Sequence, residues 1–352
     1  MTTRDEIMGL ETTDRKTVDA ITRLGLTGVT STELFEAGIV RSCRLNERNE
    51  LLTSCGTLVP RFGPETIRNK NVASVSFDRD GLLKAVYLEK QQEITTSLGS
   101  YPAEFVMFYP SGALKAFFPV NGKITGFWTQ KDEGELCPKL DFRVSCGAFS
   151  AKVSCVRFYE SGALRSMTLW PGENVLLRTN QGPLPARFGF ALFEDGTLES
   201  VEPPYPIAVE TPVGVIEALD CQAIGITGDV NSLSFWEDGS MHAVTTSHDR
   251  IDVIEGAGKT TSYAPAQVPN PLLENKTMVS PLHLSFDRLD GKRSIHLSNG
   301  VKEGSYELAS VCFRVFTGTG ESTESIRNTS QMSCGDCASC NLECSAHDRG
   351  AH

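Results

Sequence analysis

The feature that most restricts the fold of this 352-residue chain is a short pattern that recurs along it. A Phe is followed by a few polar residues, a Gly and then an apolar residue. Gly adopts the positive φ that tight turns require, so Asp-Gly or Ser-Gly between apolar runs predicts a β-hairpin. The seven copies are FEAG from Phe35, FDRDG from Phe77, FYPSG from Phe108, FYESG from Phe158, FEDG from Phe193, FWEDG from Phe235 and FDRLDG from Phe286. The chain is therefore expected to be all-β, with the hairpins forming an extended sheet or a solenoid-like stack.

The pairing within these hairpins follows from the lengths of their loops. A three-residue loop in FYESGAL places Phe158 opposite Leu164, and a two-residue turn in FEDGTL places Phe193 opposite Leu198. Register decides which side chains share a face, so a repeated apolar pair indicates a repeated geometry. The same rule predicts the pairs Phe35–Val40, Phe77–Leu83, Phe108–Leu114 and Phe235–Met241. In the seventh copy the rule places Arg293 opposite Phe286, and this hairpin is therefore expected to be irregular.

A second pattern, with Thr three residues before Gly, alternates with the first. Residues 94–105 (ITTSLGSYPAEF) and 177–188 (LRTNQGPLPARF) align without gaps, and shorter matches occur at 51–62 and 209–218, and at 142–151, where Val144 replaces the Thr. This pattern predicts a second strand–turn–strand, so one repeat contains about four short strands. Such a unit cannot bury its apolar side alone, and neighbouring units must stack or extend a shared sheet.

The hairpin pattern resembles the MORN-variant repeats of bacterial proteins often labelled antitoxin-like, which are built on a short Y/F-x-x-G-x-L hairpin. The resemblance covers most of residues 33–300 in pieces and implies a scaffold or a binding surface. The sequence contains neither G-x-S-x-G nor H-E-x-x-H, and no nucleophile-and-base group stands out. We therefore predict no catalytic residues and expect a non-enzymatic scaffold or binding protein.

Composition divides the chain into four expected segments. Residues 1–30 form a helical N-terminal segment, in which Val18, Ile21 and Leu24 share one helical face, and residues 31–316 form the hairpin-repeat domain. Residues 317–333 are rich in Gly, Ser and Thr and are expected to be a flexible linker. Residues 334–352 form a Cys-rich tail, also expected to be flexible.

The tail contains the strongest chemical signal of the sequence. Its cysteines, Cys334, Cys337, Cys340 and Cys344, have the spacing C-x2-C-x2-C-x3-C, which resembles a bacterial ferredoxin half-motif and implies a [4Fe–4S] cluster. Four closely spaced thiolates also suit a tetrahedral zinc site, and a tail without metal is the third alternative. The expected function is a binding scaffold with a metal-binding tail. The alternative is an iron–sulfur electron carrier or an accessory protein of an anaerobic redox enzyme.

Charge and cysteine usage indicate the expected surroundings of the protein. The formal net charge is −11, which repels phosphate backbones and anionic lipids, so we expect neither nucleic acid nor membrane as a partner, but another protein. The first residues lack the apolar stretch of a secretory signal, and the number of cysteines, 11, is odd. These features favour reduced thiols and a cytoplasmic location.

Three aromatic residues form a predicted partner-binding row. Tyr109, Tyr159 and Trp236 each follow a Phe of the hairpin pattern, so they point to the opposite face of the strand. Stacked repeats would align them, and an exposed aromatic row suggests a surface for a partner. The alternative is that a second sheet or an insertion covers them.

Overall fold

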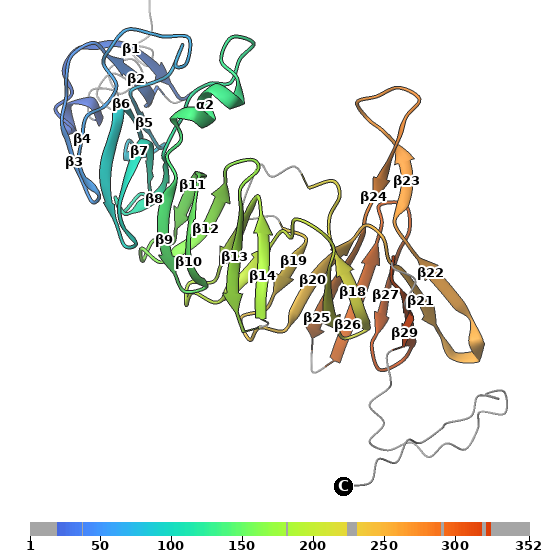
Figure 1. Cartoon of the computed structure of the whole chain (residues 1–352). Helices are drawn as coiled ribbons and strands as arrows, with labels where there is room; N and C mark the ends of the chain where they lie inside the picture. The colour runs from blue at the N-terminus through green and yellow to red at the C-terminus, as the bar shows by residue number, and fades with distance from the viewer. Residues whose placement is uncertain are drawn as a thin grey trace, which may run out of the picture.

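The protein is an elongated stack of antiparallel hairpins that follow one another in chain order (Figure 1). The computed structural model describes residues 20–36, 38–180, 182–223, 231–289, 292–318 and 322–324. The predicted all-β fold of repeated hairpins is confirmed. Among the described residues, no helix has both the length and the apolar character needed to cross a bilayer.

Fifteen strands form one antiparallel sheet, the main sheet, in which each hairpin lies beside the next. In spatial order its strands are β1 (Val29–Leu34), β2 (Val40–Leu45), β5 (Val75–Phe77), β6 (Leu83–Thr96), β7 (Gly99–Phe108), β8 (Leu114–Phe118), β11 (Val153–Phe158), β12 (Leu164–Leu169), β15 (Gly189–Leu192), β16 (Leu198–Val201), β19 (Leu233–Phe235), β20 (Met241–Thr246), β25 (Leu282–Leu289), β26 (Lys292–Ser298) and β27 (Glu303–Glu307). The first and last of these strands form the two edges of the main sheet.

A second layer of hairpins packs on one face of the main sheet. It consists of β3 (Leu51–Thr53) with β4 (Gly56–Leu58), β9 (Leu140–Val144) with β10 (Gly147–Ala151), β13 (Asn174–Thr179) with β14 (Gly182–Arg187), and β17 (Ile207–Thr211) with β18 (Gly214–Ala218). At the C-terminal end, a four-stranded sheet is formed by β21 (Arg250–Ile254), β22 (Thr260–Tyr263), β28 (Cys312–Phe316) and β29 (Ser322–Glu324). The last of these strands falls within the segment expected to be a linker.

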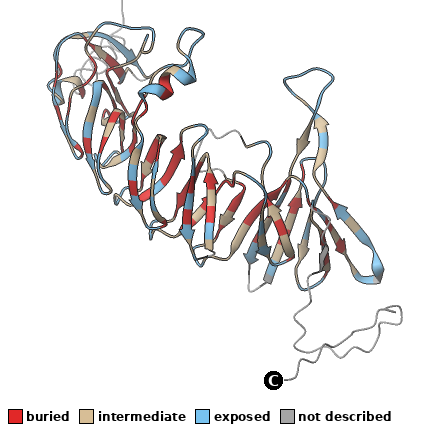
Figure 2. Ribbon diagram, viewed as in Figure 1, coloured by how far each residue is buried: buried red, intermediate tan, exposed pale blue. Residues whose placement is uncertain are grey.

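The remaining elements lie outside the two layers. A hairpin of β23 (Ala266–Pro269) and β24 (Thr277–Ser280) projects from the stack and contains no buried residue (Figure 2). The short elements are the helix α2 (Gln130–Leu136) and the 3-10 turn η1 (Gly256–Gly258). Residues 20–23 are helical and end near Gly25, as predicted, whereas residues 1–19 lie outside the described residues.

The core lies between the two layers and is rich in aromatic side chains. Phe158 of the main sheet is 1% exposed, and its ring lies 6.2 Å from that of Phe117. Contacts between the layers include the edge-to-face pair of Phe149 and Phe190, with ring centroids 6.0 Å apart. Burying apolar rings in this way is the main driving force of folding, and it explains why each hairpin carries an aromatic or aliphatic residue at this position.

Four of the predicted pairs are confirmed, and two are wrong by one residue. The confirmed pairs are Phe158–Leu164, Phe77–Leu83, Phe108–Leu114 and Phe235–Met241. In the other two hairpins, Leu192 rather than Phe193 pairs with Leu198, and Leu34 rather than Phe35 pairs with Val40.

The correction follows from the turns, which have the same length in all six hairpins. The N–H of Tyr159 donates to the carbonyl of Ala163 at 2.8 Å, and the N–H of Phe193 donates to that of Thr197 at 2.9 Å. Phe193 therefore occupies the position of Tyr159, and its neighbour Leu192 occupies the core position of Phe158. A three-residue loop ending in a left-handed Gly is a common hairpin connection, and it suits these six copies.

The seventh hairpin is regular, contrary to the prediction. Phe286 pairs with Ile295 and not with Arg293, whose partner is Arg288. The strands continue three residues beyond Phe286, to Leu289 opposite Lys292, so the turn lies further along the chain than in the other copies.

The Thr-x-x-Gly pattern forms the predicted second turn and joins the two layers. Each Thr pairs with the Gly three residues later and donates its hydroxyl to the Gly carbonyl; these pairs are Thr53–Gly56, Thr96–Gly99, Thr179–Gly182 and Thr211–Gly214. The Ser after the Thr bonds the main sheet in two of these turns: Ser54 donates to the carbonyl of Gly112 and Ser97 to that of Gly162. In the matching turn of β9 and β10, where Val144 replaces the Thr, Ser145 donates to the carbonyl of Gly196. The bonds of Ser54 and Ser145 fix the second layer against the hairpin turns of the main sheet, whereas Ser97 joins the turn between β6 and β7 to the next hairpin of the main sheet.

Candidate functional site

The face of the main sheet that is turned away from the second layer, here named the outer face, carries a row of mostly small residues in register. Ser42 lies opposite Ser76, Ser76 opposite Ala85, and Ala85 opposite Met107. Further along the sheet the row continues through Ala116, Arg157, Ser166, Ala191, Ser200, Ser234, Ala243 and Ser285. Because most of these side chains are short, Met107 and Arg157 excepted, larger residues beside them can form the walls of a depression.

A cleft of about 1050 Å³ lies above the N-terminal end of this row. Its floor includes Ser42, Ser76 and Ala85, and its walls come from β1, β2, β5, β6 and β7 and from two loops, residues 71–73 and 121–123. This volume is at the upper end of the range typical of ligand sites. The cleft is therefore a candidate ligand site on the outer face.

The lining of the cleft is strongly positive. It contains five cationic side chains and a single carboxylate, Glu33. The cations are Arg41, Arg44, Arg79, Lys84 and Lys123. The chain as a whole has a net charge of −11, so this concentration of positive charge is local. A concave, cationic surface attracts anions and repels cations.

The cations of the cleft differ in how far their charge is compensated. Arg44 pairs with Glu65 at 3.0 Å, and the guanidinium of Arg79 lies over the ring of Phe35, 5.9 Å from its centroid. Among the described residues, no carboxylate forms an ion pair with Arg41 or Lys84. These two side chains are therefore available for an anionic ligand.

One wall of the cleft is aromatic. The rings of Tyr87 and Phe105 stack with centroids 4.2 Å apart, and Phe105 in turn lies 5.2 Å from Phe118. Burial raises the pKa of Tyr87, so its phenol stays neutral at physiological pH. This wall supplies a rigid surface next to the charged groups.

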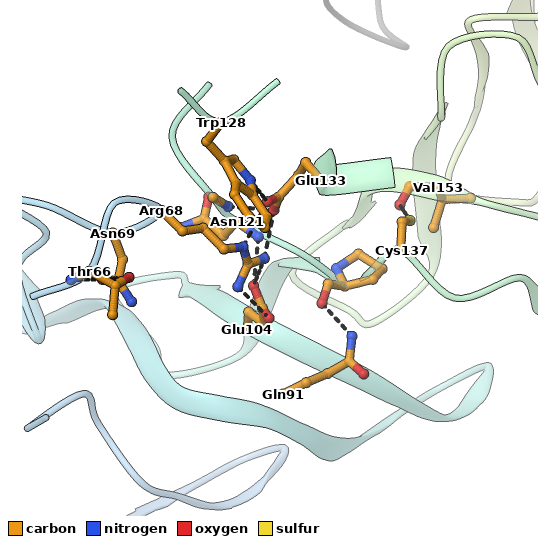
Figure 3. Close-up of polar contacts among 12 residues, drawn as sticks. Thr66, Arg68, Asn69, Gln91, Glu104, Asn121, Trp128, Glu133, Cys137 and Val153 are labelled. Atoms are coloured by element: carbon orange, nitrogen blue, oxygen red, sulfur yellow. Dashed lines mark hydrogen bonds and ion pairs between the residues drawn. The ribbon is translucent and has the colours of Figure 1, made fainter. Parts of the chain in front are cut away.

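The rim of the cleft is held by a buried ionic network (Figure 3). Arg68 donates two hydrogen bonds to Glu133, at 2.7 and 2.6 Å, and two to Glu104, at 2.9 and 2.5 Å. The indole Nε1 of Trp128 donates to Glu133 at 2.6 Å. The Glu133 side chain is only 3% exposed, so its charge depends on these partners.

The network keeps its two principal members charged. Burial tends to raise the pKa of Glu133, but hydrogen bonds from Arg68, Trp128 and the Gly122 N–H outweigh burial and lower the pKa. Burial also opposes the charge of Arg68, but the two carboxylates raise its pKa overall. The pair is thus a structural ion pair with its hydrogen-bonding positions filled.

The same network positions residues 121–123 at the cleft. The Gly122 N–H donates to Glu133 at 2.6 Å, the Asn121 N–H donates to Glu104 at 2.9 Å, and the Lys123 N–H donates to the Arg68 carbonyl at 2.8 Å. Any side chain on Gly122 would collide with the Glu133 carboxylate. Lys123 is therefore held at the rim by residues that do not themselves line the cleft.

The opposite loop contains a residue in the left-handed conformation. Asn71 has a φ of 56°, in the left-handed region that non-glycine residues seldom occupy. Its side-chain oxygen accepts from Arg44 at 3.4 Å, and its N–H donates to Glu65 at 3.0 Å. Asn is among the non-glycine residues that adopt this region most readily, and here the conformation places its side-chain oxygen beside Arg44.

Comparison with known proteins provides no relative: no protein-family model, no curated protein and no solved structure matches this chain. The resemblance to MORN-variant repeats stays a prediction, and the cleft has to be interpreted from its own chemistry.

The three aromatic residues predicted to bind a partner lie outside the cleft, at the turns of their hairpins. The Tyr109 hydroxyl donates to the Phe158 carbonyl at 2.9 Å, and the Tyr159 hydroxyl donates to the Leu192 carbonyl at 3.0 Å. The rings of Trp236 and His242 contact each other, with centroids 4.2 Å apart and planes tilted by 52°. All three are half-buried. Both tyrosines therefore bond the next hairpin, and their role in partner binding stays a prediction.

The predicted metal ligands, Cys334, Cys337, Cys340 and Cys344, lie outside the described residues. Within the described part of the chain, no group of three or more His, Cys, Asp or Glu side chains is arranged to hold a metal ion. The metal hypothesis for the tail is therefore not tested by the fold.

The sequence contains a signal for the cleft, a basic residue at the same position of successive hairpins, that was not used to predict it. Arg41 and Lys84 lie six residues after the turn residues Phe35 and Asp78, and Lys115 and Arg165 have the same place in the next two hairpins. If the hairpins are aligned on their Gly residues with one turn length for all copies, these four basic residues occupy the same position of the repeat.

Proposed function

We propose that this protein is a non-enzymatic binding scaffold whose outer-face cleft receives acidic groups of a protein partner. The observation that supports this most is the set of five cations around Glu33, in which Arg41 and Lys84 have no carboxylate partner among the described residues. Guanidinium groups bind carboxylates in a two-point geometry, and lysine adds a point charge. The chemistry of the cleft thus favours an anionic ligand.

The lining favours binding over catalysis. It contains no His, and its one thiol is that of Cys43. Burial raises the pKa of Cys43 to about 11, so the thiolate that a nucleophilic mechanism needs is scarce at neutral pH.

The test is binding of a fluorescein-labelled heptaglutamate peptide, measured by fluorescence anisotropy. The double variant Arg41→Ala/Lys84→Ala is expected to bind at least about tenfold more weakly, since hydrogen bonds to charged groups contribute about 1.5–3 kcal/mol each. The control Lys139→Ala/Lys276→Ala removes the same charge from exposed positions outside the cleft and should bind as the wild type. An equal loss of peptide affinity in both double variants, or no binding of the peptide by the wild type, would refute the proposal.

The spacing of the tail cysteines supports a second element of the function, a metal site. We expect anaerobically purified protein to contain iron or zinc, and a chain ending at Ser333 to contain neither. Within the full chain, Cys334→Ser/Cys337→Ser should lose the metal, whereas Cys221→Ser/Cys312→Ser should retain it. Brown, iron-containing protein would support the alternative of an electron carrier. Metal-free intact protein would contradict both forms of the hypothesis.

A further inference from the structure

We infer that the ligand of the cleft is an acidic peptide segment of a partner protein that carries apolar residues next to its carboxylates. The carboxylates enter the cationic cleft, and the apolar residues contact three exposed residues on its rim, Ile67, Ile124 and Phe127, here named the rim patch. The inference rests on the proposed function, because it concerns the same cleft. It adds an uncharged contact that selects among acidic ligands.

The rim patch offers apolar surface that a partner can cover. Phe127 is 84% exposed, Ile67 is 56% exposed and Ile124 is 55% exposed. Single exposed apolar residues are ordinary on protein surfaces, so the significance of these three depends on their grouping beside a cleft. An aromatic ring that becomes buried on binding is a typical anchor of a protein interface.

Backbone contacts place the rim patch directly beside the cleft. Lys123, which lines the cleft, donates its N–H to the Arg68 carbonyl at 2.8 Å. Ile67 precedes Arg68 and Ile124 follows Lys123, so the two isoleucines flank this bond. The Lys123 ammonium also donates to the Lys70 carbonyl at 2.9 Å, which joins the same two loops a second time. The rim patch therefore begins one residue beyond the wall of the cleft.

The turn that presents Phe127 is fixed by hydrogen bonds. The Thr125 hydroxyl accepts from the N–H of Phe127 at 3.2 Å and from that of Trp128 at 3.1 Å. The Thr125 N–H donates to the Trp128 carbonyl at 2.8 Å, and the Trp128 indole is bonded to the buried Glu133. A ring held in this way loses little conformational entropy when a partner covers it.

One short extended segment can reach both the cations and the rim patch. Lys84, which has no carboxylate partner among the described residues, lies three residues before Tyr87 on β6. Three residues of a strand span about 10 Å. The Tyr87 N–H donates to the carbonyl of Ser74, which directly follows the loop at 71–73 that lines the cleft. Four or five extended ligand residues therefore cover the distance from Lys84 to the rim.

The charges around the rim patch favour a peptide over an anionic membrane. Glu65 is exposed on the same loop as Ile67, and α2, which begins three residues after Phe127, carries the exposed Glu135. Together with the net charge of −11, these carboxylates repel a flat anionic lipid surface. A narrow peptide instead enters the concave cleft, where the cations outnumber the carboxylate of Glu33.

Two labelled peptides and the full chain test the inference by fluorescence anisotropy. The apolar peptide has five glutamates flanked on both sides by Leu-Phe-Leu, which allows either direction of binding. The polar peptide has Ser-Gly-Ser in place of each triplet. We expect the wild type to bind the apolar peptide at least about fivefold more tightly, since a hot-spot residue contributes more than about 1 kcal/mol. Ile124→Thr/Phe127→Ser should bind both peptides equally, with the affinity for the polar peptide unchanged.

A matched control removes apolar residues from exposed positions at the other end of the stack. Leu272 and Val301 are 89% and 70% exposed and lie outside the cleft, so Leu272→Ser/Val301→Thr should keep the preference for the apolar peptide. All four substitutions are at exposed positions, and both double variants should unfold at the same urea concentration as the wild type.

The outcomes separate the inference from the proposed function. Equal affinity of the wild type for the two peptides overturns the inference, as does a preference that persists in Ile124→Thr/Phe127→Ser. In either case, loss of the polar peptide in Arg41→Ala/Lys84→Ala would leave the proposed function intact. If neither peptide binds the wild type, both fail. Cosedimentation with vesicles of equal parts phosphatidylcholine and phosphatidylserine, lost in Ile124→Thr/Phe127→Ser, would replace the peptide by a membrane surface and overturn the inference.

Discussion

Replacing Phe158 with Ala is expected to lower the free energy of unfolding by about 3–5 kcal/mol, the range observed for truncating a buried aromatic residue. Phe158 is 1% exposed, lies opposite Leu164 and contacts the ring of Phe117. Its removal leaves a cavity between the two layers, which a tightly packed core refills only in part. Domains are stable by about 5–15 kcal/mol, so this single change removes a large fraction of the stability.

Equilibrium unfolding in urea measures the effect. Glu160→Ala serves as the control, because this residue is exposed in the loop of the same hairpin and should change stability by less than about 0.5 kcal/mol. If Phe158→Ala destabilised the protein by less than about 1 kcal/mol, the residue would not be part of a buried core as described.

The second large effect is expected from Glu133→Ala, which removes the central carboxylate of the rim network. Breaking a buried ion pair costs about 3–5 kcal/mol of unfolding free energy. Because Arg68 keeps its contact with Glu104, we expect a loss at the lower end of this range. The variant also removes the acceptor of the Gly122 N–H, so residues 121–123 should exchange their amide hydrogens faster.

The contribution of Glu133 should depend on pH with a defined sign. Its pKa is lowered in the folded state, so it stabilises the protein fully above the ordinary Glu pKa of about 4.3. This contribution is lost as the pH falls through the lowered pKa that Glu133 has in the folded state. The stability gap between the wild type and Glu133→Ala should therefore narrow in acid and be constant near neutrality.

Glu135 provides a matched control on the same helix. It is exposed, and Glu135→Ala should leave both stability and exchange near the wild-type values. A Glu133→Ala variant as stable as Glu135→Ala, with unchanged exchange at residues 121–123, would show that the network does not hold the rim.

The fold was largely predictable because its turns are encoded locally. The Gly of each hairpin and the Thr-x-x-Gly pattern define turns within a few residues, and the structure has them where they were expected. The two wrong pairs arose because Leu192 and Phe193 are both apolar, as are Leu34 and Phe35. Apolar pairing alone cannot separate adjacent registers, whereas the position of the Gly can.

The cleft was not predictable from local patterns, because it depends on contacts across distant parts of the chain. Its floor brings Ser42, Ser76 and Ala85 together through the register of three strands, β2, β5 and β6. Its rim joins Arg68 to Glu104 and Glu133, which are 36 and 65 residues away in the sequence. Such pairings depend on the packing of the whole sheet. They also depend on the insertion that contains α2, where the local sequence indicates a helix cap but not the contacts with Arg68.

The central claim is that the cleft binds acidic groups, and amide hydrogen exchange of the full chain with and without heptaglutamate tests it most directly. We expect slower exchange in the segments that line the cleft, residues 29–45, 75–87 and 121–123, with no change in the projecting hairpin at 266–280. Protection confined to other parts of the protein, or none at saturating peptide, would contradict the claim.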